Sequence, residues 1–163
     1  VISTGAVTTL AGTGSSGSAN GTGTSASFNA PEGITTDETI LYVADTSNNL
    51  IRQIVISTGV VTTVAGTGSS GSANGTGTSA SFNLPQGITT DGTNLYVTEN
   101  NNHTIRQIVI STGVVTTVAG TGSSGSANGT GTSASFSSPY GITTDGTNLY
   151  VADMSNHLIR KIE

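Results

Sequence analysis

The stretch Pro85–Gly120, PQGITTDGTNLYVTENNNHTIRQIVISTGVVTTVAG, contains four short runs of β-branched and aromatic residues separated by three polar turns. The first turn, Asp91–Asn94, contains an Asp-Gly pair, which favours a tight hairpin. The runs alternate apolar and polar residues in the manner of half-buried strands, and none of them shows helical periodicity. The stretch therefore predicts four short antiparallel strands joined by tight turns.

The whole chain repeats this pattern with a period of 54 residues. The pentapeptide VISTG opens each repeat, and the repeats are 1–54, 55–108 and 109–162. Several units of four antiparallel strands are typical of a β-propeller, in which each unit is one blade. A β-solenoid fits less well, because its coils usually take about 20–30 residues.

The third repeat contains PYGITTDGTNLYVADMSNHLIRKI at Pro139–Ile162, which resembles the NHL repeat, a propeller blade named for the triplet Asn-His-Leu. That triplet occupies 156–158, and the other repeats depart from it at one position, with NNL at 48–50 and NHT at 102–104. The patterns Pro-x-Gly-Ile, Leu-Tyr-Val and Ile-Arg hold in every repeat, so the resemblance covers the whole chain. It implies an all-β propeller, and it leaves the function open because such propellers include scaffolds, RNA binders and some enzymes.

One segment, GSSGSANGTGTSASF, is identical in the three repeats, at Gly14–Phe28, Gly68–Phe82 and Gly122–Phe136. Its composition is that of a flexible linker. In a propeller, however, this segment must join the outer strand of one blade to the inner strand of the next. We therefore expect an ordered strap, in which glycine permits sharp turns, Asn-Gly pairs form a tight turn, and the terminal phenylalanines anchor between blades.

The predicted blades leave the ring incomplete. They cover roughly 31–66, 85–120 and 139–162, so the last blade lacks its outer strand, whereas 1–11 reads as an outer strand without a blade. Propellers typically have at least four blades, and exposed sheet edges favour aggregation. We expect a homodimer that closes six blades, with strand 1–11 of each chain completing the last blade of its partner. A trimer of nine blades is the less favoured alternative.

An acidic residue ends the second strand of each repeat, and strand pairing places an arginine diagonally across from it on the same face. The expected intrablade ion pairs are Asp45–Arg52, Glu99–Arg106 and Asp153–Arg160, which use every arginine in the chain. A ring of carboxylates around a hard cation such as Ca²⁺ is the alternative. His103 and His157 lack a nearby second ligand, so we interpret them as turn residues and predict neither a metal nor a cofactor.

The repeats differ most beside the proline and in the turn that follows the second strand. In a four-stranded blade both segments lie at the same end, near the central channel, where propellers commonly bind partners. The candidates for a ligand face are Glu32, Thr46, Gln86, Asn100, Tyr140 and Met154. Neutral drift in exposed loops is the alternative explanation of these differences.

The charge of the chain argues against two classes of partner. A net charge of −5 with only four basic residues argues against nucleic acid and anionic membranes as partners. The chain has no cysteine, so disulfides do not form. A surface dominated by Ser, Thr, Asn and Gly would suit an extracellular or cell-surface protein.

These observations predict a non-enzymatic scaffold or binding module that assembles with itself and binds a protein or small ligand near the channel. One alternative is a propeller enzyme of the lactonase or lyase type with a metal in the channel. Nearly identical blades argue against it, because such sites combine unlike residues from several blades. The other alternative is a purely structural or engineered repeat fragment without a ligand.

Overall fold

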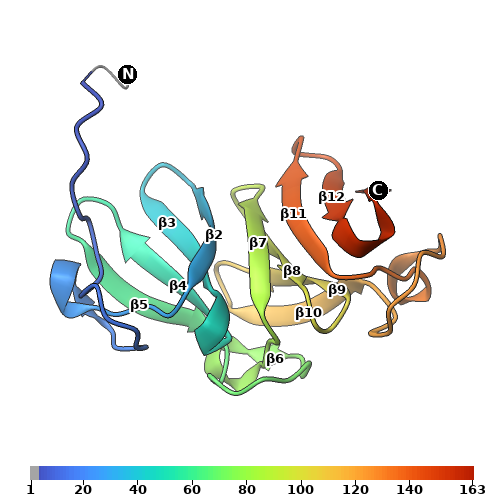
Figure 1. Ribbon diagram of the computed structural model, residues 1–163, viewed down its shortest axis with the longest axis horizontal. Coiled ribbons are helices and arrows are strands. Elements are labelled where there is room, and N and C mark those ends of the chain that lie inside the picture. The colour runs from blue at the N-terminus through green and yellow to red at the C-terminus, as the bar shows by residue number, and fades with distance from the viewer. Residues whose placement is uncertain (1–3) are drawn as a thin grey trace.

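The computed structural model describes residues 4–163, which form three antiparallel sheets set side by side in an arc (Figure 1). We call them blades 1, 2 and 3; their strand orders are β1-β5-β4-β3-β2, β6-β10-β9-β8-β7 and β11-β12-β13. The strands are β1 Gly21–Thr22, β2 Pro31–Thr36, β3 Ile40–Asp45, β4 Leu50–Val55, β5 Val60–Ala65, β6 Gly75–Thr76, β7 Pro85–Thr90, β8 Asn94–Glu99, β9 Thr104–Val109, β10 Val114–Ala119, β11 Pro139–Thr144, β12 Leu149–Asp153 and β13 Leu158–Ile162. The propeller-blade prediction is confirmed.

The described part of the chain also has five one-turn 3-10 helices between its strands: η1 Gly23–Ser25, η2 Thr46–Asn48, η3 Gly77–Ser79, η4 Gly131–Ser133 and η5 Met154–Asn156. Three of them lie in the straps and two lie in the turns after β3 and β12. Among residues 4–163, no helix is long and apolar enough to cross a membrane.

The first turn of each blade is organised by its aspartate. In blade 1, Asp37 Oδ1 accepts hydrogen bonds from the backbone N–H groups of Thr39 (3.0 Å) and Ile40 (2.8 Å), an arrangement that mimics a backbone turn. Hydrogen bonds, chiefly the one from the Thr39 hydroxyl, lower the pKa of Asp37 to about 2. The Tyr42 hydroxyl donates to Asp37 Oδ2, and burial together with this bond raises the pKa of Tyr42 to about 12.

Glu38 occupies a left-handed position in this turn, with φ of 78°, where blades 2 and 3 have Gly92 and Gly146 at 86° and 88°. A non-glycine residue costs roughly 1–2 kcal/mol in this region. We expect Glu38→Gly to raise the free energy of unfolding by about 1 kcal/mol, measured by urea denaturation. The reverse change, Gly92→Glu, should lower it by a similar amount, and a neutral result for both would contradict this explanation.

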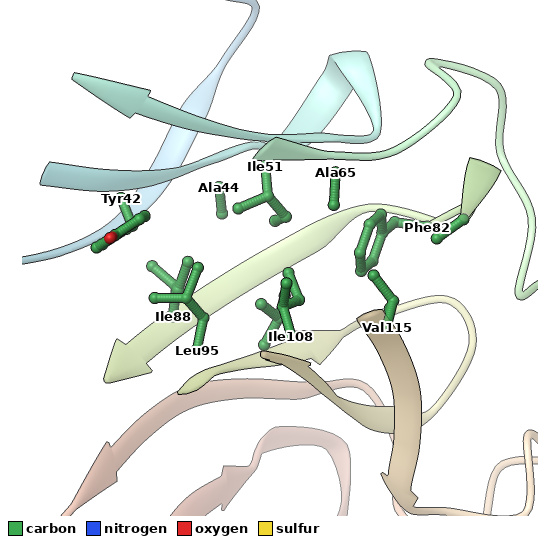
Figure 2. Packing of buried hydrophobic residues seen from close by; sticks show 11 residues of the cluster. Tyr42, Ala44, Ile51, Ala65, Phe82, Ile88, Leu95, Ile108 and Val115 are labelled. Carbon is green, nitrogen blue, oxygen red and sulfur yellow. The ribbon is translucent and has the colours of Figure 1, made fainter. Parts of the chain in front are cut away.

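The hydrophobic core lies between blades rather than within them. Figure 2 shows Tyr42, Ala44 and Ile51 of blade 1 facing Ile88 and Leu95 of blade 2. Blades 2 and 3 enclose a second cluster around Ile105, Leu149 and Val151. Each blade therefore needs a neighbour in order to bury its apolar face.

The straps are ordered, as expected. Phe82 is buried in the cluster between blades 1 and 2 (Figure 2), and Phe136 is buried in the cluster between blades 2 and 3. Within each strap a parallel bridge brings the phenylalanine back to an earlier serine, as in Ser16–Phe28. The expected tight turn at Asn20-Gly21 is wrong: Gly21–Thr22 is extended as β1 and pairs with β5, because the outer edge of that strand offers free backbone groups.

Candidate functional site

One buried arginine fastens each strap to its blade. In blade 1, Arg52 Nη1 lies 2.9 Å from Asp45 Oδ2, and both side chains are fully buried. The same guanidinium donates to the backbone oxygens of Ser27 (3.2 Å) and Ala19 (3.1 Å) and stacks on the Phe28 ring. Arg106–Glu99 and Arg160–Asp153 form the corresponding pairs, each also at 2.9 Å.

Both carboxylate oxygens of the blade 1 pair accept hydrogen bonds. Asp45 Oδ1 accepts from Asn29 N–H at 2.7 Å, and its Oδ2 accepts from Asn48 Nδ2 at 2.8 Å as well as from the arginine. The Asn48 amide also donates to the Gly17 carbonyl oxygen. Residues 4–163 bring no group of three His, Asp or Glu side chains together in a form that could hold a metal ion.

The asparagines of this network were not predicted from the sequence. Asn20 Oδ1 accepts from Arg52 Nη2 at 2.8 Å, and Asn74 and Asn128 do the same for Arg106 and Arg160. Their presence in every strap was the available signal. A strap that looked like a linker thus supplies acceptors that a buried guanidinium requires.

Three of the six ligand-face candidates occupy the second position of the innermost strands: Glu32 in β2, Gln86 in β7 and Tyr140 in β11. The Tyr140 hydroxyl donates to Glu32 Oε2 at 2.7 Å, which links blade 3 to blade 1 and raises the pKa of Tyr140. Gln86 Oε1 is buried and has no hydrogen-bond partner among residues 4–163, so it is a free acceptor.

The other three candidates follow the second strands and have different environments. Thr46 is buried, and its hydroxyl donates to the Pro85 carbonyl oxygen of blade 2 at 2.6 Å, so it faces the neighbouring blade. Asn100 is half-buried, and its backbone N–H donates to the Leu84 carbonyl oxygen. Met154 is exposed at the start of η5.

Two blade faces have no neighbour within the described chain. On the face of blade 1 that points away from blade 2, Ile34 is 60% exposed, whereas Ile88, its counterpart in blade 2, is 5% exposed. On the face of blade 3 that points away from blade 2, Ile159 is 77% exposed, whereas its counterparts Ile51 and Ile105 are fully buried. We call these the leading face of blade 1 and the trailing face of blade 3.

The outer edge of blade 3 is also open. Within the described residues 4–163, strand β13 pairs only with β12. A cleft runs beside β13, lined by Phe136, by 159–163 and by strap residues 128–131. Strands β5 and β10 fill the equivalent positions in blades 1 and 2.

The segment Ala6–Gly12 has nearly the sequence of β5 and β10, AVTTLAG against VVTTVAG, yet it belongs to no sheet here and runs away from blade 1 (Figure 1). Its Gly12 N–H donates to the Gly23 carbonyl oxygen, as Gly66 N–H does to Gly77. The predicted strand 1–11 is described from residue 4 onward, and residues 1–3 lie outside the described range.

Comparison with known proteins places these blades in a family. No protein-family model matches the chain. NHL repeat-containing protein 2 of Bos taurus is 37% identical over 160 residues, which are 88% of this chain and 22% of that protein. The chain therefore spans about a fifth of the length of this relative.

Solved structures agree with the fold. A structural genomics protein of unknown function from Bacteroides thetaiotaomicron is 26% identical, with a TM-score of 0.70 over 76% of this chain and 32% of that one. An auxiliary nutrient binding protein from Bacteroides ovatus is 26% identical, with a TM-score of 0.67 over 77% of this chain and 35% of that one. The chain is a run of NHL repeats, and residues 4–163 form two complete blades and three strands of a third blade of a β-propeller.

Proposed function

We propose that the chain is a non-enzymatic scaffold module that closes a six-bladed propeller ring with a second copy of itself. The observation that carries the proposal is the pair of open faces at opposite ends of the arc. Ile34 and Ile159 are exposed there, whereas every counterpart inside the chain is buried or half-buried. Joining the trailing face of one copy to the leading face of another would bury both in the way that the internal junctions do.

The open strand edge supports the same assembly. Segment Ala6–Ala11 of one copy would pair with β13 of the other and fill the cleft beside it. In this register Val7 lies opposite Ile162, as Val61 lies opposite Ile54 and Val115 lies opposite Ile108. Adding a strand to a free edge satisfies backbone groups that otherwise face water.

The mass of the particle in solution tests the ring proposal. Light scattering after size exclusion should give twice the chain mass of 16.1 kDa. Three times that mass would favour the trimer of nine blades. A particle that stays at 16.1 kDa at high micromolar concentration would contradict the proposal.

We further propose that the channel end of the ring binds a protein or small ligand. Glu32 and Tyr140 meet there across two blades, and Gln86 leaves an acceptor unused. The name of the Bacteroides ovatus protein, an auxiliary nutrient binding protein, gives indirect support for a binding role.

For any partner found in a binding screen, Tyr140→Ala and Met154→Ala should weaken binding by roughly tenfold or more. The reason is that Tyr140 and Met154 are the large apolar side chains among the six candidates, and they are 41% and 50% exposed. The particle mass of Tyr140→Ala serves as the control and should not change. Met154 occupies the position of Thr46, which faces the neighbouring blade, so the mass of Met154→Ala shows whether that variant also disturbs the ring. Unchanged affinity in both variants would reject this end of the ring as the binding face.

A further inference from the structure

A side-chain acceptor at one repeated position joins each blade to the next. Asn49 Oδ1 accepts a hydrogen bond from the Leu84 N–H of blade 2 at 3.0 Å, and His103 Nδ1 accepts one from the Ser138 N–H of blade 3 at 3.1 Å. Oδ1 of asparagine and Nδ1 of histidine both lie one bond beyond Cγ. The two residue types can therefore serve the same contact.

Both partners of this contact have left-handed backbones. Asn49 and His103 have φ of 54°, and Leu84 and Ser138 have φ of 50°. Residues with positive φ are strained unless the surroundings hold them. The side-chain hydrogen bond holds the donor residue just before the proline that opens the next inner strand.

A glycine forms the second part of each internal junction. A Cβ on Gly33 would collide with the Gln86 carbonyl oxygen of blade 2, and a Cβ on Gly87 would collide with the Tyr140 carbonyl oxygen of blade 3. The inner strands of neighbouring blades therefore pass so closely at this point that a side chain does not fit.

The third repeat carries the same parts without a neighbour. His157 has φ of 57° and is exposed, and a Cβ on Gly141 would meet only the Ala152 methyl group, at 3.8 Å. At the other end of the chain, Ala30 has φ of 48° and is exposed. Neither the Ala30 N–H nor the His157 ring makes a hydrogen bond within residues 4–163.

We propose that His157 and Gly141 are the residues that recognise a second copy, His157 Nδ1 accepting the Ala30 N–H and Gly141 seating the Glu32 carbonyl oxygen of that copy. This inference rests on the proposed ring. The occupant is a second copy because the leading face has Ala30 and Glu32 at the positions of Leu84 and Gln86, which contact blade 1 inside the chain. The closing junction then continues an interface that the chain already forms twice.

The decisive variant is Gly141→Ala. Because its Cβ has room in the single chain, Gly141→Ala should fold with the parental circular dichroism spectrum, yet it should lose the dimer at concentrations where the parent is dimeric. Gly87→Ala is the matched control, since the same change inside the chain should disturb the junction between blades 2 and 3 and lower the melting temperature.

Variants at His157 test the hydrogen bond without a steric clash. A lost hydrogen bond should weaken each junction by roughly fivefold to tenfold. His157→Ala should therefore raise the dissociation constant of a two-junction dimer by about 25-fold to 100-fold, measured by analytical ultracentrifugation. His157→Asn should keep nearly parental affinity, because Asn49 makes the same contact inside the chain.

The outcomes separate this inference from the ring proposal. A monomeric parent would overturn both. A dimeric parent whose Gly141→Ala variant is equally dimeric would overturn the junction and leave the ring standing. Equal weakening by His157→Ala and His157→Asn would reject the hydrogen bond.

Discussion

Val7→Asp should abolish assembly and leave the single chain folded. Val7 is 94% exposed, whereas its counterparts Val61 and Val115 are each 1% exposed, so assembly should bury Val7 against the partner. The dimer contains two copies of Val7, one from each chain. Losing the burial of both weakens the dimer by about 3–6 kcal/mol, and burying two carboxylates in their place adds to this cost. We therefore expect the dissociation constant to rise at least about a thousandfold, measured by analytical ultracentrifugation.

Two further variants serve as controls for this experiment. Ala6 corresponds to Val60 and Val114, which are partly exposed on the solvent side of their strands, so Ala6→Asp should have little effect on assembly. Val115→Asp places the same charge at the equivalent position inside the chain and should unfold blade 2. An undiminished dimer in Val7→Asp would show that this segment does not fill the cleft beside β13.

Arg106→Ala should cause the largest loss of stability within the chain. The Arg106 guanidinium is fully buried, bonds to Glu99 at 2.9 Å and reaches the strap oxygens of Ser81, Ala73 and Asn74. Its removal leaves the carboxylate of Glu99 buried without its countercharge, which typically costs 3–5 kcal/mol. Urea denaturation should show a loss of about 3–5 kcal/mol in the free energy of unfolding.

The stability comparison is cleanest in the Val7→Asp background, where unfolding should not depend on protein concentration. Arg106→Lys keeps the charge but cannot reproduce the planar fork of donors, so we expect an intermediate loss. Lys161→Ala is the matched control, because Lys161 and its partner Glu163 are exposed and such pairs contribute little. A loss below about 1 kcal/mol for Arg106→Ala would contradict the structural role of the buried pair.

The sequence was sufficient to predict the blades, because the residues that form each turn and each strand are close together in the chain. The Asp-Gly turn after β7 and the alternation in Val114–Ala119 depend on residues close in the chain. The pairing of Asp45 with Arg52 could also be expected, since strand register alone brings the two side chains together.

Contacts between repeats could not be predicted in the same way. The hydrogen bond from Tyr140 to Glu32 joins residues 108 positions apart, and the bond from Ser138 to His103 crosses a blade junction. Their geometry depends on how the blades are inclined to one another, which the spacing of residues along the chain does not encode. The short strand at Gly21–Thr22 was missed for a related reason: glycine-rich sequence has weak strand propensity, and pairing with β5 overrides it.

In the proposed ring, Ala6–Ala11 of each copy pairs with β13 of the other copy. Because the chain has no cysteine, the double variant Val7→Cys with Ile162→Cys tests this pairing directly. Residues directly opposed in an antiparallel pair have Cα atoms about 4.5–5.5 Å apart, a separation that a disulfide can span. Val7→Cys with Lys161→Cys is the control, because residue 161 points to the other face of the strand.

After oxidation and denaturation without reductant, we expect the Val7→Cys, Ile162→Cys chain to have twice the 16.1 kDa chain mass, with two intermolecular disulfides, and the control pair to link poorly. A mass that remains at 16.1 kDa, or equal linking by both pairs, would rule out this strand pairing.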